Sequence, residues 1–245
     1  MPNRLAGADI LKNLPGPDVC RFLQGSFLDS RQDAGAANAT RVTLSLVYFV
    51  LERAQCVLWG AAGADYTEAT RLKPDYADAY YNRGLTYVDL KQYDKAIADY
   101  TEAIRLKANY ADAYYNRGNA YYDLEQYDKA IADYTEVIRL KPDYAGAYYN
   151  RGNAYVRLKQ YDEAIADYSE VIRLKPDYAG AYYSRGNAYL VNDLKQYDKA
   201  IADYTEAVRL KPDYAGAYDN RAFAYEKLGQ IEKAKEDRAK AEQLK

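Results

Sequence analysis

From residue 74 onward, apolar and polar positions recur with the period of an α-helix. In the stretch 74–107, Tyr80, Gly84 and Tyr87 fall at positions i, i+4 and i+7, which lie on one helical face. Between residues 93 and 104 the apolar side chains again recur three and four positions apart, and a short polar interruption separates the two patterns. This stretch is therefore predicted to form two helices joined by a turn.

The two-helix pattern recurs because the sequence itself repeats. The string DYTEAIRLK at 99–107 returns with few changes at 133–141, 167–175 and 203–211, at a spacing of 34 residues that widens to 36 before the last copy. A period of this length is typical of stacked helical repeats. The full units, numbered repeat 1 to repeat 5 in chain order, are 74–107, 108–141, 142–175, 176–211 and 212–245.

Prolines mark the junctions between repeats. They stand at positions 74, 142, 176 and 212, where a proline ends one helix or opens the next. The aspartates that follow them, such as Asp75 and Asp143, are suited to cap the N-terminus of the next helix. No strand pattern occurs in 74–245, so the sequence predicts an all-α fold.

A single helix pair of this length cannot bury its apolar stripe, whereas stacked pairs share a continuous core. We therefore expect a right-handed solenoid of antiparallel helix pairs, an α-α superhelix, with five full repeats of 34–36 residues. The string ADYTEATRLK at 64–73 adds a degenerate half repeat before repeat 1. Gly84 and Ala96 are expected where the paired helices approach closely, and Tyr80 and Tyr100 where they leave wider gaps.

At these residues the chain resembles the tetratricopeptide repeat (TPR) family. That motif has a large aromatic residue, glycine and tyrosine in the first helix, then alanine, an aromatic residue, alanine and proline in and after the second. The resemblance covers residues 74–245 and implies a TPR solenoid whose first helices line the concave surface. The matching residues are Tyr80, Gly84, Tyr87, Ala96, Tyr100 and Ala103 in repeat 1, with Pro142, Pro176 and Pro212 in later repeats.

An arginine replaces the leucine that usually precedes the glycine of this motif, and an aspartate recurs in every second helix. The interval from each aspartate to the arginine of the next repeat is constant along the chain. A buried guanidinium needs partners, so we expect either an Arg–Asp ladder across the repeat junctions or arginine stems that lie over tyrosine rings. Both alternatives stay open. The residues are Arg83, Arg117, Arg151, Arg185 and Arg221, with Asp65, Asp99, Asp133, Asp167 and Asp203.

Repeat 5 departs from the others in its second helix. Lys235, Arg238 and Glu242 stand where repeat 1 has apolar or aromatic residues. The terminal repeat of a solenoid needs a polar outer face because no neighbour covers it. The last helix is therefore predicted to be a solvent-exposed cap.

The N-terminal segment lacks the repeat. Residues 1–40 form a poorly defined segment with turn-forming proline and glycine, and 41–73 is predicted to be a degenerate half repeat that caps the array. Within it, Val42–Leu51 is expected to pack under repeat 1; disorder, membrane association and a recently joined sequence are the alternatives. This apolar run is too short to span a bilayer, and no secretory signal follows Met1, so a cytoplasmic location is expected.

Composition narrows the possible chemistry. The chain has no histidine and 2 cysteines, so it lacks the commonest general base and the residues of a zinc site or a disulfide framework. Its 34 Lys and Arg alternate with 36 Asp and Glu, which is not the pattern of a nucleic-acid-binding protein. No glycine-rich phosphate loop occurs. We therefore expect a non-enzymatic protein without catalytic residues, metal or cofactor.

Tyrosine, with 30 copies, and asparagine form rows on the first helices beside the core stripe. An asparagine amide can exchange hydrogen bonds with the backbone of an extended peptide, and tyrosine adds rigid apolar area with a polar tip. The rows resemble the asparagine ladders of peptide-binding TPR superhelices; a carboxylate clamp would instead place lysine at Tyr81 and Tyr115. Asparagine that only solvates the helix is the alternative. The predicted peptide-binding residues are Tyr81, Asn82, Tyr115, Asn116, Asn119, Tyr149, Asn150, Asn153, Tyr183, Ser184, Asn187 and Asn220.

These features predict a protein–protein interaction scaffold that holds an extended peptide or protein segment in its concave groove. The alternative is a structural or self-assembling repeat array without a defined peptide ligand. A binder needs Tyr and Asn that face the groove, whereas an assembler needs an exposed patch at one end. Nucleic acid and membrane are not expected as partners, while the identity of the protein partner and the oligomeric state stay open.

Overall fold

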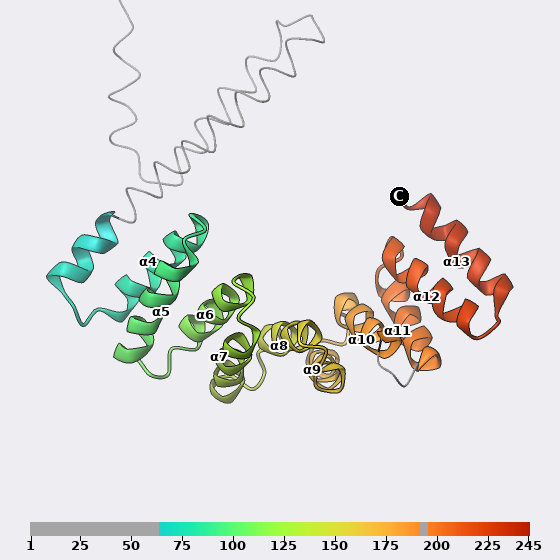
Figure 1. The fold of residues 1–245 in the computed structure, drawn as a ribbon, viewed down its shortest axis with the longest axis horizontal. Helices are drawn as coiled ribbons and strands as arrows, with labels where there is room; N and C mark the ends of the chain where they lie inside the picture. Colours follow the sequence, from blue (N-terminus) through green and yellow to red (C-terminus); the bar gives the residue numbers. More distant parts are fainter. Residues whose placement is uncertain (1–63, 192–195) are drawn as a thin grey trace, which may run out of the picture. The chain divides into compact units, whose positions relative to one another are not determined.

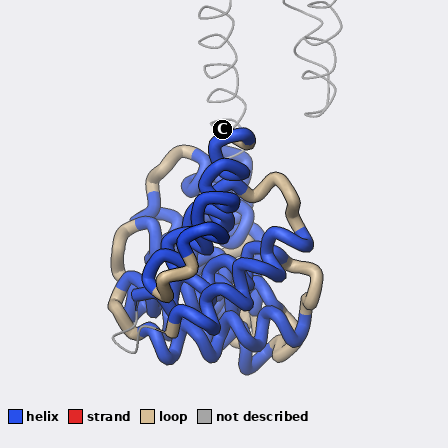
Figure 2. Tube along the Cα trace, turned by 90° about the vertical axis from the view of Figure 1, so that its right-hand side faces the viewer, coloured by secondary structure: helices blue, strands red, loops and turns tan. Residues whose placement is uncertain are grey.

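The computed structural model describes residues 64–191 and 196–245. The chain divides into two compact units, Met1–Asp65 and Tyr66–Lys245, and the second is described here by itself. The predictions made for residues 1–63, including the packing of Val42–Leu51, lie outside the described residues. Every regular element in the described ranges is a helix (Figure 2).

Ten helices follow one another between residues 74 and 245, in the part of the chain that the structure describes. Each predicted repeat supplies two of them, and the helical residues 64–72 precede the first. None of the described helices is long and apolar enough to cross a membrane. The helices are α4 (Ala77–Asp89), α5 (Tyr93–Leu106), α6 (Ala111–Asp123), α7 (Tyr127–Leu140), α8 (Ala145–Arg157), α9 (Tyr161–Leu174), α10 (Ala179–Val191), α11 (Tyr197–Leu210), α12 (Ala215–Lys227) and α13 (Ile231–Gln243).

Helices pack in chain order. Each first helix packs on the second helix of its own repeat, and that second helix packs on the first helix of the next repeat. First helices of neighbouring repeats also touch one another, as α4 does with α6 and α6 with α8. Figure 1 shows the first helices along one side of the row and the second helices along the other. The arrangement confirms the predicted all-α superhelix of stacked helix pairs.

The turns between repeats differ in detail from the prediction. Asp75 and Asp143 do not cap the helices that follow, because Tyr76 and Tyr144 come between and no side chain caps either helix. Each Asp instead lies in the turn, where the backbone carbonyl of Asp143 accepts a hydrogen bond from the amide of Ala145 at 3.0 Å. The proline–aspartate pair therefore forms the turn, and the tyrosine that follows it is the N-cap residue of the helix.

The core is built from one large tyrosine per repeat and small residues opposite it. Tyr100 is fully buried, as are its equivalents in repeats 2, 3 and 4. On the facing helix, Ala79 and Gly84 are buried, while Tyr80 and Tyr87 are only half-buried. The predicted wide gap at Tyr80 is thus wrong: the ring from the second helix fills the interior, and the first helix contributes small residues.

Glycine on the first helix makes room for that ring. A Cβ atom added to Gly84 would lie 2.6 Å from Cε1 of Tyr100, and one added to Gly152 would lie 2.8 Å from Cε1 of Tyr168. Real Cβ contacts are longer, so the helices pair as closely as predicted only because the glycine has no side chain. In repeat 5 Ala222 replaces the glycine, and Arg238, which is exposed, replaces the tyrosine.

The arginine row pairs with the aspartate row inside each repeat, not across the junctions. Arg151 donates two hydrogen bonds to Asp167, at 2.8 and 2.7 Å, and this aspartate follows later in the same repeat. The predicted ladder from Asp133 to Arg151 is therefore wrong, because the antiparallel helices α8 and α9 bring Arg151 against its own second helix. The other pairs are Arg83–Asp99, Arg117–Asp133, Arg185–Asp203 and Arg221–Asp237.

The remaining guanidinium nitrogen reaches the preceding repeat. Nη1 of Arg151 donates to Oγ1 of Thr135 at 2.9 Å, and Nη1 of Arg117 donates to Oγ1 of Thr101 at 3.0 Å. In repeat 1, Nη1 of Arg83 donates to Thr70 in the helical residues 64–72 at 2.9 Å, while Thr67, the equivalent of Thr101, is 3.5 Å away. Each guanidinium also lies 5.4–6.0 Å from the centre of a tyrosine ring, so the charged head rather than the stem of the arginine contacts the aromatic residues.

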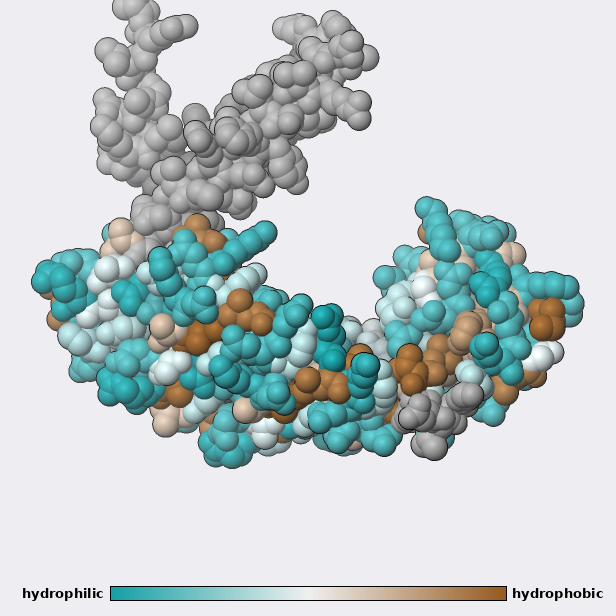
Figure 3. Space-filling model, viewed as in Figure 1, coloured by the Kyte–Doolittle hydropathy of each residue, from teal (hydrophilic) through white to brown (hydrophobic). Residues whose placement is uncertain are grey.

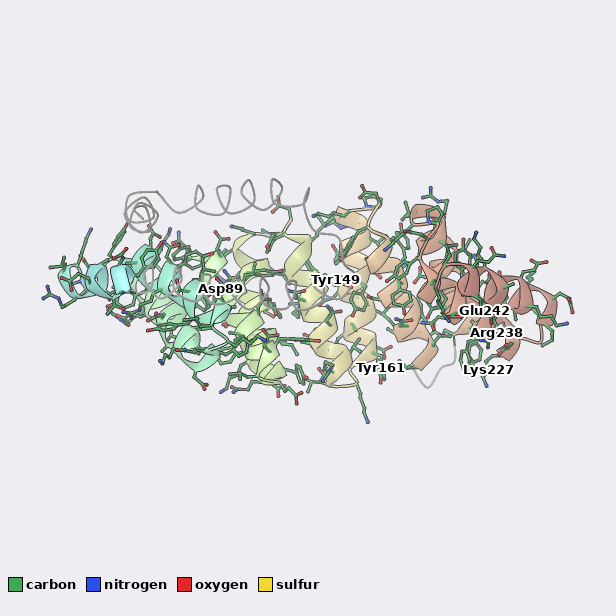
Figure 4. The ribbon with its side chains drawn as sticks, turned by 90° about the horizontal axis from the view of Figure 1, so that it is seen from above. Asp89, Tyr149, Tyr161, Lys227, Arg238 and Glu242 are labelled. Carbon is green, nitrogen blue, oxygen red and sulfur yellow. The ribbon has the colours of Figure 1, made fainter. Side chains whose placement is uncertain are left out.

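The last helix carries the polar face that the sequence predicts. Lys235, Arg238 and Glu242 are exposed on α13, and Figure 4 labels the latter two. Where earlier repeats have a groove tyrosine, repeat 5 has Asp219, whose carboxylate pairs with Lys245 at 2.9 Å. The surface at this end is mostly hydrophilic in the view of Figure 3. The prediction of a solvated cap is confirmed.

Candidate peptide-binding groove

All twelve predicted peptide-binding residues lie on the first helices α4, α6, α8, α10 and α12, and all are half-buried. In α6, α8 and α10 they recur at i, i+1 and i+4, as Tyr149, Asn150 and Asn153 do, whereas α4 carries the first two positions and α12 only the second. The repeat period returns the chain to the same helical face, so the rows run from repeat to repeat. We call this surface the groove face.

The structure joins the tyrosine row to the asparagine row of the next repeat. Nδ2 of Asn116 donates to the hydroxyl of Tyr81 at 2.9 Å, and Nδ2 of Asn150 donates to the hydroxyl of Tyr115 at 2.9 Å. The same contact links Tyr149 with Ser184 at 3.1 Å and Asn220 with Tyr183 at 3.3 Å. Each repeat is therefore tied to its neighbour through the groove face.

A second set of bonds runs from the core to the groove face. The buried Tyr134 donates its hydroxyl to Oδ1 of Asn119, and Tyr168 donates to Oδ1 of Asn153, both at 2.8 Å. Nδ2 of Asn150 also donates to Oδ1 of Asn119 at 3.0 Å. Burial raises the pKa of these tyrosines above its usual value, so their hydroxyls stay protonated donors into the alkaline range.

The network decides which amide groups remain for a ligand. Oδ1 of Asn119 accepts two bonds, and the amide of Asn119 also contacts the Tyr115 hydroxyl, where it opposes the rise in the pKa of that group. Nδ2 of Asn150 donates twice, and its Oδ1 accepts no bond from a described residue. An amide group offers two donors and two acceptor positions. At this junction Asn119 therefore keeps one N–H donor and Asn150 keeps its carbonyl acceptor, which sequence spacing could not reveal.

Each groove tyrosine also packs between two other rings. The ring centre of Tyr115 lies 5.9 Å from that of Tyr134 and 5.1 Å from that of Tyr144 in the next turn. Burial is the largest cause that raises the pKa of Tyr115, to about 12. The rings are therefore held in place by the fold before any ligand arrives, which lowers the entropy cost of binding.

The network is broken at repeat 1. Leu85 stands where repeats 2, 3 and 4 have asparagine, and the buried hydroxyl of Tyr100 has no hydrogen-bond partner among the described residues. The equivalent hydroxyl of Tyr204 donates to Asn187 at 2.7 Å. An unsatisfied buried hydroxyl costs free energy that a satisfied one does not.

We therefore expect opposite effects from the same substitution in two repeats. Tyr100→Phe should raise the free energy of unfolding by about 1 kcal/mol, because it removes an unpaired polar group. Tyr168→Phe should lower it by about 1 kcal/mol, because Asn153 loses its donor. Urea denaturation followed by circular dichroism measures both. Equal effects of the two substitutions would show that the Tyr100 hydroxyl is paired in solution.

Two hollows open between neighbouring repeats on the groove face. One, of about 310 Å³, is lined by Asn119, Asn150 and Asn153 together with Tyr122, Asp123 and Tyr134. The other, of about 400 Å³, is lined by Tyr115, Tyr149 and Asn150 together with Gly146, Lys175 and Tyr178, among others. Both contain predicted residues, and Asn150 lines both. Figure 4 looks onto the row of helices with Tyr149 near its middle.

The hollows include residues that the sequence did not single out. Tyr122 and Asp123 come from the end of α6, and Lys175 and Tyr178 come from the turn after α9. The recurring tyrosine before each first helix is the signal that could have found Tyr178. Among the described residues, no group of three or more acidic or cysteine side chains could hold a metal ion.

A right-handed array of helix pairs with a groove of tyrosine and asparagine defines a TPR-type superhelix, and the family comparisons agree. A family model described as TPR repeat matches residues 59–91, 84–124, 118–159, 152–193 and 190–229, and one described as tetratricopeptide repeat matches 215–245. The chain belongs to the tetratricopeptide repeat family. The TPR fold is commonly a scaffold for protein–protein interaction, and proteins of the family are typically non-enzymatic.

Solved structures of the same fold are similar to this chain at low identity. A crystal structure of MamA is 28% identical, with a TM-score of 0.63, and the match covers 66% of this chain and 93% of that one. MamA from Desulfovibrio magneticus RS-1 is 26% identical, with a TM-score of 0.65 and coverage of 69% and 94%. YrrB, described as a TPR protein with an unusual peptide-binding site, is 24% identical, with a TM-score of 0.65 and coverage of 74% and 92%. At this identity the likeness to YrrB shows the fold alone. No curated protein matches the sequence.

Proposed function

We propose that this protein binds an extended peptide or protein segment along its groove face and has no catalytic activity. The observation that carries the proposal is the pair of hollows at α6 and α8, lined by half-buried tyrosine and asparagine with free amide groups. An extended segment presents alternating backbone donors and acceptors, which the remaining N–H of Asn119 and the Oδ1 of Asn150 complement.

The asparagines have two roles in this proposal. The bonds of Asn116 to Tyr81 and of Asn150 to Tyr115 hold neighbouring repeats in register, and Asn150 also lines both hollows. The network therefore fixes the orientation of each amide before a ligand binds. The exposed charges of α13 do not form the apolar end patch that a self-assembling array needs, so the described surface favours a binder over an assembler.

The test uses a peptide selected from a random phage-displayed library on the full-length protein. The double variant Asn116→Ala/Asn150→Ala should bind the selected peptide more than about tenfold more weakly, because each lost hydrogen bond contributes about 1 kcal/mol. Fluorescence anisotropy of the labelled peptide measures the affinity, and circular dichroism checks the fold.

The matched control is Asn109→Ala. Asn109 is exposed in the turn before α6 and lies outside the groove face, so its loss should leave the affinity unchanged. If the double variant stays folded and keeps full affinity, the groove face is not the binding site. A library that yields no binder to the folded protein would favour the structural array.

A further inference from the structure

Charge is distributed unevenly along the groove face. Near the start of the first helix, repeats 1 and 2 have Asp78 and Asp112, whereas repeats 3, 4 and 5 have glycine at this position. At the last residue of the first helix, repeats 1 and 2 have Asp89 and Asp123, whereas repeat 3 has a cation, Arg157. In α6, each of these two positions is three or four residues from a predicted binding residue. Both positions of the repeat therefore lie on the same helical face as the binding residues.

Two of the four carboxylates are free. Asp112 pairs with Lys141 at 2.8 Å, and Asp78 lies against the hydroxyl of Tyr110, whose pKa it helps to raise. Asp89 and Asp123 are exposed and form no ion pair with any described residue. Asp123 lines the smaller hollow, and Asp89 holds the equivalent position in repeat 1.

Repeats 3 and 5 carry a cation at the last residue of the first helix. Arg157 is 52% exposed, and its nearest carboxylate, Glu125, is 3.8 Å away. Lys227 ends α12 at the position of Asp89, and its ammonium lies 5.0 Å from the ring of Phe223, which is 40% exposed. Figure 4 labels Asp89 and Lys227 toward opposite ends of the row, with Tyr149 between them.

A second, independent observation points to a polar occupant at the acidic end. The hydroxyl of Tyr100 is buried without a partner among the described residues, next to the ring of Tyr81 at a centroid distance of 5.9 Å. Its equivalents reach the groove face through asparagine, but here Leu85 leaves that bond unmade. Repeat 1 thus combines an exposed carboxylate with a buried hydroxyl whose donor is unused, and a cationic side chain supplies a partner for the carboxylate.

We propose that the groove selects an extended segment whose lysine or arginine side chains lie over α4 and α6, with no basic side chains over α8 to α12. This inference rests on the proposed function. The carboxylate of Asp123 attracts the cationic head, while the half-buried ring of Tyr122 covers the aliphatic stem. Arg157 and Lys227 repel a second basic block, so the groove fixes the direction in which the segment lies.

The test uses two labelled synthetic peptides of serine and tyrosine that differ only in one half of their length. That half carries lysines in one peptide, the lysine peptide, and glutamates in the other. The lysine peptide should bind the full-length protein at least about fivefold more tightly at low salt, and the difference should shrink as salt screens the charges. Asp89→Asn/Asp123→Asn should weaken the lysine peptide by about fivefold, from two partly exposed ion pairs. Fluorescence anisotropy measures each affinity.

The matched control is Asp94→Asn/Asp128→Asn, which removes the same charge from exposed positions on the second helices α5 and α7. It should leave the affinity for the lysine peptide within twofold of the original. Equal losses in the two double variants, or equal binding of the two peptides, would overturn the charge selection.

The same measurements distinguish a failure of the charge selection from a failure of the proposed function. A library-selected peptide that depends on Asn116 and Asn150 but not on Asp89 and Asp123 overturns only the selection of basic segments. Lysine-peptide binding that depends on Asp89 and Asp123 but not on Asn116 and Asn150 overturns the groove as the backbone-binding site and, with it, the alignment proposed here.

Discussion

Replacing Arg151 with alanine is expected to lower the free energy of unfolding by about 3 kcal/mol, because the substitution leaves a buried carboxylate without its cation. The side chains of Arg151 and Asp167 are 17% and 6% exposed, and two hydrogen bonds join them. Burial raises the pKa of the Asp167 carboxyl, and the hydrogen bonds from Arg151 oppose that rise. Without the guanidinium, burial and the nearby Glu170 still act on Asp167, and both disfavour its charged form.

A pair of double-mutant cycles identifies the partner. Arg151→Ala combined with Asp167→Ala should cost less than the two single changes together, because the double variant holds no orphaned charge. Arg151→Ala combined with Asp133→Ala should be additive, since Asp133 pairs with Arg117. Urea denaturation of the full-length variants, fitted with a nearest-neighbour model of repeat unfolding, gives both coupling energies. Coupling between Arg151 and Asp133 instead would contradict the pairing within repeats.

The core of repeat 3 should respond even more strongly. Tyr168→Ala is expected to lower the free energy of unfolding by about 3–5 kcal/mol, because it empties the space of a buried ring. Gly152→Ala should lower it by about 1 kcal/mol, since the new Cβ would lie 2.8 Å from Cε1 of Tyr168, and this clash outweighs the better helix propensity of alanine. The same urea titrations measure both substitutions.

The sign of the glycine effect should reverse when the ring is absent. In the Tyr168→Ala background, Gly152→Ala should raise the free energy of unfolding by about 1 kcal/mol, because only helix propensity remains. Repeat 5 offers the matched control, since Ala222 stands at the glycine position and the exposed Arg238 at the tyrosine position. Ala222→Gly should lower the free energy by about 1 kcal/mol. An unchanged sign at Gly152 would mean that the helices separate to admit the methyl group.

The sequence sufficed for the fold because helix period and repeat length are local properties. It could not choose the partner of Asp133, because Arg117 precedes this aspartate and Arg151 follows it at nearly equal separations along the chain. In a perfect repeat both separations recur in every unit, so spacing alone cannot distinguish a contact within a repeat from one across a junction. The packing of α6 on α7 decides it, and that packing is a tertiary property.

The groove shows the same limit in another form. Helical spacing predicts that Asn116 and Asn150 share a face, and the structure places them on one. The hydrogen bond from the amide of Asn116 to Tyr81 joins residues of different repeats, and no helical pattern encodes it. The free donors and acceptors of this surface can therefore be identified only when the tyrosine hydroxyls that bond to the asparagine amides are known.

The junction contacts have an evolutionary consequence. Each arginine binds the aspartate of its own repeat and a threonine or serine of the preceding one, and these partners recur in repeat after repeat. Unequal recombination that deletes or duplicates one interior repeat would bring an equivalent hydroxyl to the same arginine. The new repeat junction would therefore have the same contacts as the original junction. Array length, and with it the length of segment that the groove can hold, is then free to change in steps of one repeat. The helix that bears Arg238 is the exception, because its polar face fits only the end of the array.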